Sequence, residues 1–200
     1  EIIAMASEES GINEKLFGKI DERLKIPSWF KPLKRPYEGE LFPPESNNFV
    51  SDDNLFNFQA KVIKDLAGSE SCVIVGRCAD YALADYPNAI HLFIYGNDDV
   101  KTKRIMEKYE LTESKAREMI NKKDKQRQSY YNYYSSKKWG AVESYDFCLD
   151  SSYLGIGRTV ELIQTMVAHK EHPITSPTEF DWRPVFHGNG VEDLLLDLRG

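Results

Sequence analysis

Residues 72–77 read Cys-Val-Ile-Val-Gly-Arg, four apolar residues followed by a glycine and an arginine. The apolar run predicts a buried strand, Cys72–Val75, and the glycine predicts a turn at its end. Open α/β sheets bind ligands at the carboxyl ends of their strands, and a guanidinium there can hold a phosphate through two hydrogen bonds. Arg77 is therefore a candidate phosphate-binding residue, with a surface salt bridge as the alternative role.

Outward from this stretch, apolar runs alternate with segments of helical periodicity. Strands are predicted at Cys72–Val75, Ala89–Tyr95 and Tyr145–Leu149. Helices are predicted at Glu1–Glu9, Asn13–Leu24, from Ser51 to Leu66, Ala79–Asp85, Val100–Tyr109, from Thr112 to Tyr134, and Gly157–Ala168. The prolines of Ile26–Asn48 predict a loop, because proline sustains neither a helix interior nor a central strand. Apolar strands separated by helices are typical of a parallel sheet covered on both faces.

The composition sets limits on the function. The chain has 200 residues, is 41% hydrophobic and carries a formal net charge of −6. It can therefore bury the core of one domain, and as a whole it is not drawn to polyanions. No apolar run approaches the roughly 20 residues of a membrane span, which argues against a membrane partner. The cysteines Cys72, Cys78 and Cys148 are odd in number and lack metal-site spacing, which favours a reduced, cytoplasmic setting.

A charged segment on the predicted helix from Thr112 to Tyr134 is the second candidate site. Lys123, Asp124 and Arg127 lie three and four residues apart, on one face with Tyr131 and Tyr134. Phosphoryl transfer needs positioned cations that neutralise the charge of the transferring group. An ordinary solvated charged helix is the alternative interpretation of such a run.

Four stretches, in this order and spacing, together resemble one family: VIVGRCADYAL, HLFIYGNDDVKTKRIM, KKDKQRQSYYNYYSSKKWG and YDFCLDSS. They are similar to the cytidylate kinase-like family of P-loop nucleoside monophosphate kinases, over roughly Glu1–Ala168. The resemblance implies an α/β protein with a three-layer P-loop kinase-like fold, a parallel sheet and a helical lid from roughly Val100 to Trp139. It also implies a kinase-like domain over residues 1–170. Such kinases usually begin with a strand, a glycine-rich phosphate loop and a helix, and the resemblance starts just after that point. Either that segment belongs to the full protein, or another segment takes its place.

The resemblance assigns roles to the charged residues. Arg77 would hold the acceptor phosphate, although Cys78 follows it where cytidylate kinases usually have Asp. Asp124 and Arg127 match an Asp-x-x-Arg pair of the lid that contacts the acceptor nucleotide and the transferring phosphate. Lys123 and Arg127 would stabilise the charge of the transition state.

The same resemblance implies less specific roles for three further basic residues. Lys122, like Lys123, could supply the other lid cation, and Lys101 with Arg104 looks like the basic pair that backs the lid. The implied activity is Mg²⁺-dependent transfer of the γ-phosphoryl group of ATP to CMP, dCMP or a similar small-molecule nucleotide. Asp150–Ser152 would lie near the nucleotide base.

A nucleic-acid-binding module is the alternative from another class. Basic residues between positions 115 and 138 outnumber Glu118 and Asp124, and they are interleaved with tyrosines: Lys115, Arg117, Lys122, Lys123, Lys125, Arg127, Lys137 and Lys138. Such tracts can bind single-stranded nucleic acid, because the basic side chains attract its phosphate backbone and the aromatic rings stack on its bases. The acidic remainder of the chain and Arg77 argue against a nucleic-acid partner. The tyrosines have packing at the root of the lid as their other role.

A third possibility is a kinase-like remnant that binds a nucleotide or a partner without catalysis. It arises because no Gly-x-x-x-x-Gly-Lys-Ser/Thr phosphate loop occurs in Glu1–Gly200. The segment 171–200 is an acidic, proline-containing tail beyond the resemblance, and its role stays open. The histidines His91, His169, His172 and His187 show no metal-ligand spacing, so no metal site is assigned to protein residues.

Overall fold

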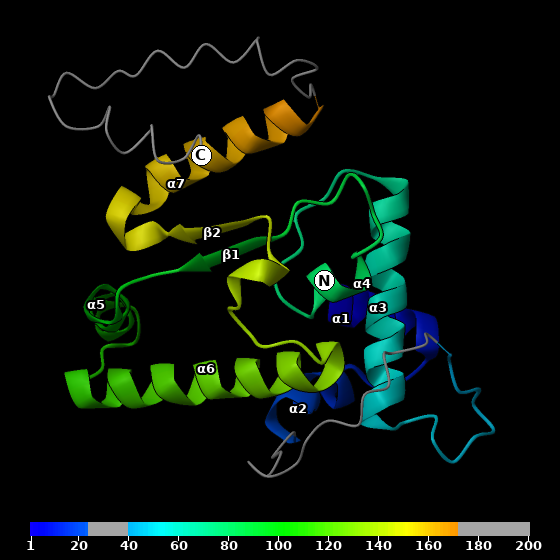
Figure 1. Ribbon diagram of the computed structural model, residues 1–200. Helices are drawn as coiled ribbons and strands as arrows, with labels where there is room; N and C mark the ends of the chain where they lie inside the picture. Colours follow the sequence, from blue (N-terminus) through cyan, green and yellow to red (C-terminus); the bar gives the residue numbers. More distant parts are fainter. Residues whose placement is uncertain (24–39, 172–200) are drawn as a thin grey trace, which may run out of the picture. The chain divides into compact units, whose positions relative to one another are not determined.

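The computed structural model describes residues 1–23 and 40–171 and has a mixed helix and sheet architecture. Its contacts divide the chain into two units, Glu1–Val160 and Glu161–Gly200. The elements in chain order are α1 (Ile2–Ser10), α2 (Glu14–Arg23), α3 (Asp52–Ser69), α4 (Ala79–Ala82), β1 (Leu92–Tyr95), α5 (Asp98–Tyr109), α6 (Glu113–Ser135), the short 3₁₀ turn η1 (Val142–Ser144), β2 (Phe147–Asp150) and α7 (Ser151–Glu171) (Figure 1).

The two strands pair in parallel, as the alternation of strands and helices predicts. Leu92 lies opposite Phe147 and Tyr95 opposite Asp150. The connection from β1 to β2 runs through α5 and α6, which is the long crossover that a parallel pair requires. The carboxyl ends of both strands therefore lie at the same edge, where α5 and α7 begin.

The predicted strand Cys72–Val75 is wrong for the described residues, because this segment has no ladder of hydrogen bonds. Val73 and Val75 are 94% and 86% exposed, whereas Ile74 between them packs against the core. The alternation of an extended strand is thus kept. A strand exists only where a neighbour accepts and donates its backbone hydrogen bonds, and within the described residues no neighbouring strand does so.

The hydrophobic core lies among the first three helices and the last turns of α6. Phe17, Leu55 and Phe56 are at most 1% exposed. The ring of Tyr134 stacks on Phe56 with 4.0 Å between centroids. Tyr130, Tyr131 and Tyr134 are all buried, so these tyrosines pack at the root of α6, the second of the two roles considered for them.

Side-chain caps account for the starts of two helices. The hydroxyl of Ser51 accepts a hydrogen bond from the backbone N–H of Asn54 and begins α3. Asn97 does the same for Asp99 and begins α5. Both caps satisfy backbone donors that no helical carbonyl can reach.

Three helix boundaries differ from the sequence predictions. The third helix continues through Gly68 to Ser69, since an interior glycine costs only about 1 kcal/mol and the neighbouring Leu66 and Ala67 pack against the core. The fourth ends at Ala82 rather than Asp85. Gly155, with φ 74° and ψ 163°, interrupts α7 after its first turn. The predicted helix Gly157–Ala168 is the second part of α7.

A buried asparagine ties the loop before α3 to that helix. Asn54 is fully buried; its side chain accepts from the N–H of Phe42 at 2.8 Å and donates to the carbonyls of Phe42 and Phe49 at 3.2 and 2.8 Å. This loop belongs to the predicted loop Ile26–Asn48. Residues 26–39 of that loop and residues 172–200 of the predicted tail lie outside the described residues.

Candidate functional site

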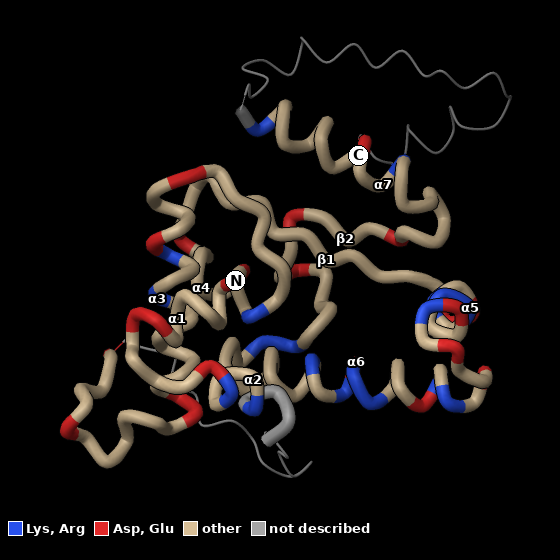
Figure 2. The backbone as a smooth tube through the Cα atoms, turned by 180° about the vertical axis from the view of Figure 1, so that it is seen from behind, with Lys and Arg blue, Asp and Glu red and all other residues tan. Residues whose placement is uncertain are grey.

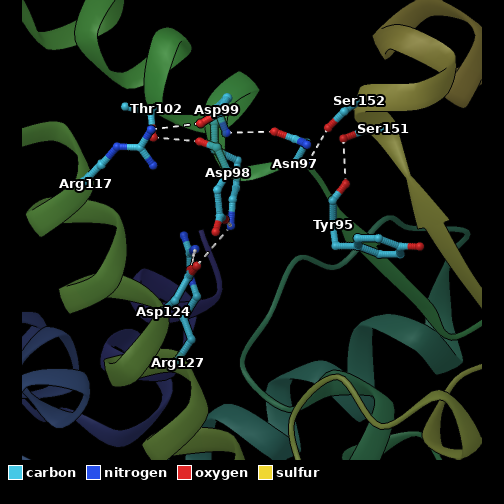
Figure 3. A network of polar contacts seen from close by, with 11 residues as sticks. Tyr95, Asn97, Asp98, Asp99, Thr102, Arg117, Asp124, Arg127, Ser151 and Ser152 are labelled. Atoms are coloured by element: carbon cyan, nitrogen blue, oxygen red, sulfur yellow. Dashed lines mark hydrogen bonds and ion pairs between the residues drawn. The ribbon is translucent and has the colours of Figure 1, made fainter. Parts of the chain in front are cut away.

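The carboxyl ends of β1 and β2 are joined by two serines at the start of α7. The hydroxyl of Ser151 donates to the carbonyl of Tyr95 at 2.9 Å, and the backbone N–H of Asn97 donates to the hydroxyl of Ser152 at 2.6 Å (Figure 3). A Cβ atom on Gly96 would lie 2.9 Å from that hydroxyl, so the close approach requires glycine. Both serine hydroxyls therefore bind the backbone that leads into α5.

An ion-pair network connects α5 to α6 and contains three of the predicted site residues. The Nζ atom of Lys101 lies 2.7 Å from Oδ1 of Asp98 and 3.6 Å from Oδ2 of Asp124. The Nη1 atom of Arg127 donates to Oδ1 of Asp124 at 3.1 Å (Figure 3). One carboxylate thus receives two cations from two helices. The hydrogen bond from Lys101 lowers the pKa of Asp98.

A second ion pair joins the same two helices further along. Arg117 donates to Asp99 at 2.8 Å and to Glu113 at 2.9 Å (Figure 3). These hydrogen bonds, the one to Asp99 first, raise the pKa of Arg117. Exposed pairs of this kind contribute at most about 1 kcal/mol, so their effect is on the alignment of α5 with α6. The sequence shows Arg117 only as one member of a basic tract.

Three predicted site residues stay outside this network. Arg104, Lys122 and Lys123 are exposed, and none of them forms an ion pair within the described residues. Lys and Arg are frequent along α5 and α6 (Figure 2). The structure therefore brings Lys101, Asp124 and Arg127 together and leaves the other three as solvent-facing cations on the same helices.

Arg77 lies in a turn with unusual backbone geometry. Gly76, Arg77 and Cys78 have φ angles of 74°, 57° and 53°, so three consecutive residues are left-handed. A non-glycine residue in this conformation costs about 1–2 kcal/mol. Such strain persists only where the surroundings hold it, and it concentrates at functional sites. Arg77 itself is half-buried, and Cys78 is buried at the start of α4.

A partly buried hydrogen bond connects this turn to the root of α6. The hydroxyl of Tyr131 donates to Oδ2 of Asp80 at 2.6 Å, across 51 residues of sequence. Burial, and then the Asp80 carboxylate, raise the pKa of Tyr131. The hydroxyl of Tyr145 contributes less to the same rise. Sequence reasoning missed Asp80, whose only signal was its position three residues after Arg77.

An open pocket lies elsewhere, between α1 and α3. It has a volume of about 410 Å³ and is lined by apolar side chains, such as Met5 and Val62, and by carboxylates, among them Glu8 and Asp65. These carboxylates would repel a phosphate. Among the described residues, no group of three His, Cys, Asp or Glu side chains is placed to hold a metal ion. None of the helices in the described ranges is long and apolar enough to cross a membrane.

The structure is thus a mixed helix and sheet protein with a parallel strand pair, in which α5, the helix after β1, is joined to α6 by ion pairs. The chain belongs to the cytidylate kinase-like family, whose sequence profile matches residues 1–153. This membership indicates a kinase-like, nucleotide-binding function at a coarse level. It confirms the family resemblance of the four sequence stretches.

A solved structure supports the same relationship. The chain is similar to the crystal structure of an uncharacterized protein from Eubacterium ventriosum ATCC 27560, with 38% identity and a TM-score of 0.56. The similarity covers 59% of this chain and 74% of that chain. None of the curated proteins matches the sequence.

Proposed function

We propose that this protein is a nucleoside monophosphate kinase-like enzyme that transfers the γ-phosphoryl group of ATP to CMP, dCMP or a similar nucleotide. The observation that carries the proposal is the sharing of Asp124 by Lys101 and Arg127. It gathers cations of two helices at one point, which phosphoryl transfer requires. The proposal includes a three-layer P-loop kinase-like fold, a lid formed by α5 and α6, and a cytoplasmic location.

In the proposed reaction, an oxygen of the acceptor phosphate attacks the γ-phosphorus of ATP. The bond from that phosphorus to the bridging oxygen of the β-phosphate breaks, and ADP leaves. Negative charge accumulates on the equatorial oxygens during transfer. The side chain of Arg127 is 66% exposed and, among the described residues, forms an i,i+3 pair with Asp124, so it can reorient toward that charge.

The other predicted residues take roles around this step. Arg77 holds the acceptor phosphate, and Asp124 orients the acceptor or the lid. Lys123 assists Arg127 in stabilising charge, since the two lie one helical turn apart on α6. Lys101, Arg104 and Lys122 surround the nucleotide phosphates: Lys101 through its pair with Asp124, and the other two as exposed cations.

The metal of the proposed reaction belongs to the phosphate donor. Mg²⁺ enters bound to ATP, as part of the substrate, and neutralises phosphate charge when bound. The described residues do not fit a resident metal site, because no three potential ligands lie together among them. The charged residues named above are therefore proposed to bind the acceptor nucleotide and to form the lid.

Calorimetric titration with CMP, dCMP, AMP and cytidine tests the proposal. We expect saturable binding of a cytidine monophosphate, and weaker binding of cytidine, which lacks the phosphate. Arg77→Ala should remove this difference, whereas Lys64→Ala on the exposed side of α3 should leave it unchanged. Absence of binding by every monophosphate would contradict the proposal. A coupled assay of ADP formation with MgATP then separates a kinase from a non-catalytic nucleotide-binding remnant.

The nucleic-acid alternative loses its stacking surface in this structure. Tyr130, Tyr131 and Tyr134 are buried, so their rings are not available to stack on bases. The basic tract on α6 could still attract a phosphate backbone. RNA binding that falls steeply with salt, without any monophosphate binding, would favour that alternative.

A further inference from the structure

The hydrogen bond between Tyr131 and Asp80 joins two parts of the proposed site. Asp80 follows the left-handed turn Gly76–Cys78 and lies in the first turn of α4. Tyr131 is 5% exposed and stands one helical turn after Arg127 on the same face of α6. This contact thus connects the segment that carries Arg77 with the helix that carries Arg127.

The backbone hydrogen bonds within the turn are local. The N–H of Ala79 donates to the carbonyl of Gly76 at 3.1 Å, and the N–H groups of Tyr81 and Ala82 donate to the carbonyl of Cys78 at 3.0 Å. These bonds shape the turn, and Cys78 is buried in the core. The bond from Tyr131 to Asp80 spans 51 residues at 2.6 Å and ties the end of the turn to α6.

Tyr145 supports Tyr131 from the other side. The two rings stack with 6.4 Å between centroids, and the Tyr145 hydroxyl is one of the smaller causes that raise the pKa of Tyr131. The ring of Tyr145 also contacts Phe93 of β1, with 5.1 Å between centroids. Tyr131 is therefore held by its hydrogen bond to Asp80 and by packing against the segment that leads into β2.

We propose that Asp80 and Tyr131 are positioning residues, whose hydrogen bond directs Arg77 toward the acceptor phosphate and couples the Arg77 turn to the root of α6. This inference rests on the proposed function and extends it to two residues outside the predicted site. Neither residue touches the nucleotide. Their effect reaches the phosphate through Arg77.

The test compares Tyr131→Phe with Tyr133→Phe, which removes a hydroxyl from the same helix but from a contact with Asp53 of α3. For Tyr131→Phe we expect an approximately tenfold loss of CMP affinity, the scale of one hydrogen bond to a charged group, and unchanged affinity for cytidine. Tyr133→Phe should change neither. In an Arg77→Ala background, Tyr131→Phe should have no further effect on CMP binding, because the residue through which it acts is gone.

Three results would overturn the inference while leaving the proposed function intact. These are CMP affinity within twofold of wild type in Tyr131→Phe, equal losses for CMP and cytidine, or additive losses in the double variant. Asp80→Asn, which keeps the shape and one acceptor oxygen, should lose less affinity than Asp80→Ala.

A ligand-free measurement separates this inference from the proposed function. The NMR signal of the Arg77 Nε–H group, assigned with Arg77→Lys, should shift in Tyr131→Phe and stay in place in Tyr133→Phe. An unmoved signal would refute the coupling. Wild-type protein that binds no monophosphate would refute the proposed function and the phosphate-directing role with it, whatever the signal shows.

Discussion

The Nζ atom of Lys101 lies 3.6 Å from Oδ2 of Asp124, and this ion pair joins α5 to α6. The same carboxylate receives Arg127 at 3.1 Å. Asp124 therefore holds one cation from each of two helices at a single point. In the proposed function, a bound nucleotide phosphate would meet both cations together, because their common carboxylate positions them.

Arg127→Ala should lower kcat for phosphoryl transfer by about 100-fold or more, the scale found when one preorganised charge stabiliser is removed. The measurement is steady-state ADP formation with MgATP and CMP. Lys125→Ala removes an exposed cation two residues away and serves as the matched control. A fall in kcat of less than about threefold for Arg127→Ala would rule out its catalytic role.

Asp124→Asn should lower the affinity for the acceptor nucleotide while leaving the free energy of unfolding almost unchanged. The ion pairs of Asp124 are partly exposed, so their loss should change the free energy of unfolding by less than about 1 kcal/mol. Acceptor affinity should fall at least about tenfold, because Lys101 and Arg127 lose their common anchor. Calorimetric titration and thermal unfolding measure the two quantities. Glu118→Gln on the same helix should change neither, and an unfolding effect larger than the binding effect would contradict the prediction.

Alkaline pH should unfold the protein through its buried tyrosines. Burial is the first cause that raises the pKa of Tyr131 and of Tyr134 in the folded protein. A raised folded pKa means that the stabilising contribution is complete below the unfolded tyrosine pKa of about 10 and is lost as the pH rises above it. The melting temperature should therefore fall above about pH 10.

Tyrosinate absorbance and near-ultraviolet circular dichroism, followed together, check this expectation. Tyr131→Phe should reduce the loss of stability above about pH 10, whereas Tyr153→Phe, at a residue that is 88% exposed, should not. Reversible titration of all 11 tyrosines with the folded signal intact would show the prediction to be wrong.

Gly96→Ala should destabilise the protein by about 1–3 kcal/mol, the cost of a lost backbone hydrogen bond. The new Cβ would lie 2.9 Å from the Ser152 hydroxyl and would displace it from the N–H of Asn97. The double variant with Ser152→Ala should cost less than the sum of the single variants, since the clash is already gone. Denaturant unfolding measures the four free energies, and strict additivity would contradict the proposed clash.

Asn54→Ala should cost about 2–3 kcal/mol of unfolding free energy, because backbone groups of Phe42 and Phe49 lose their partners. Limited proteolysis should then cut within residues 40–50 faster than in wild type. Asn48→Ala, at an exposed position in the same loop, is the control. Equal proteolysis of the two variants would contradict the role of Asn54 as the tie between loop and helix.

The sequence predicted the helices well because their signals are local. Ser51 and Asn97 cap helices where their side-chain chemistry indicates, and the spacing of Asp124 and Arg127 indicates the pair that forms between them. Cys72–Val75 failed because a strand depends on a partner that its own residues do not specify. The alternating exposure of Val73, Ile74 and Val75 shows that only the pairing was missed.

The contacts that join distant segments were beyond sequence reasoning. Nothing in the local pattern near Asp80 indicates that it meets Tyr131, 51 residues away. The same holds for Asn54, which resembles a surface residue of a helix start and yet is fully buried against the preceding loop. Periodicity shows which face a residue occupies, whereas its partner on another element depends on how the elements pack.

Because α6 is long, a small rotation at its tyrosine end would produce a large displacement at its other end. Its 23 residues extend about 34 Å at 1.5 Å per residue. Its tyrosines belong to the core cluster at one end, whereas Ala116, near the other end, is buried outside that cluster. A rotation of about 10° about the tyrosine end would move the far end by about 6 Å, by simple leverage on a rod of this length. Arg117 would carry α5 along through Asp99. Slight repacking around Phe56 and Tyr134 is thus amplified into a displacement as large as a phosphate group.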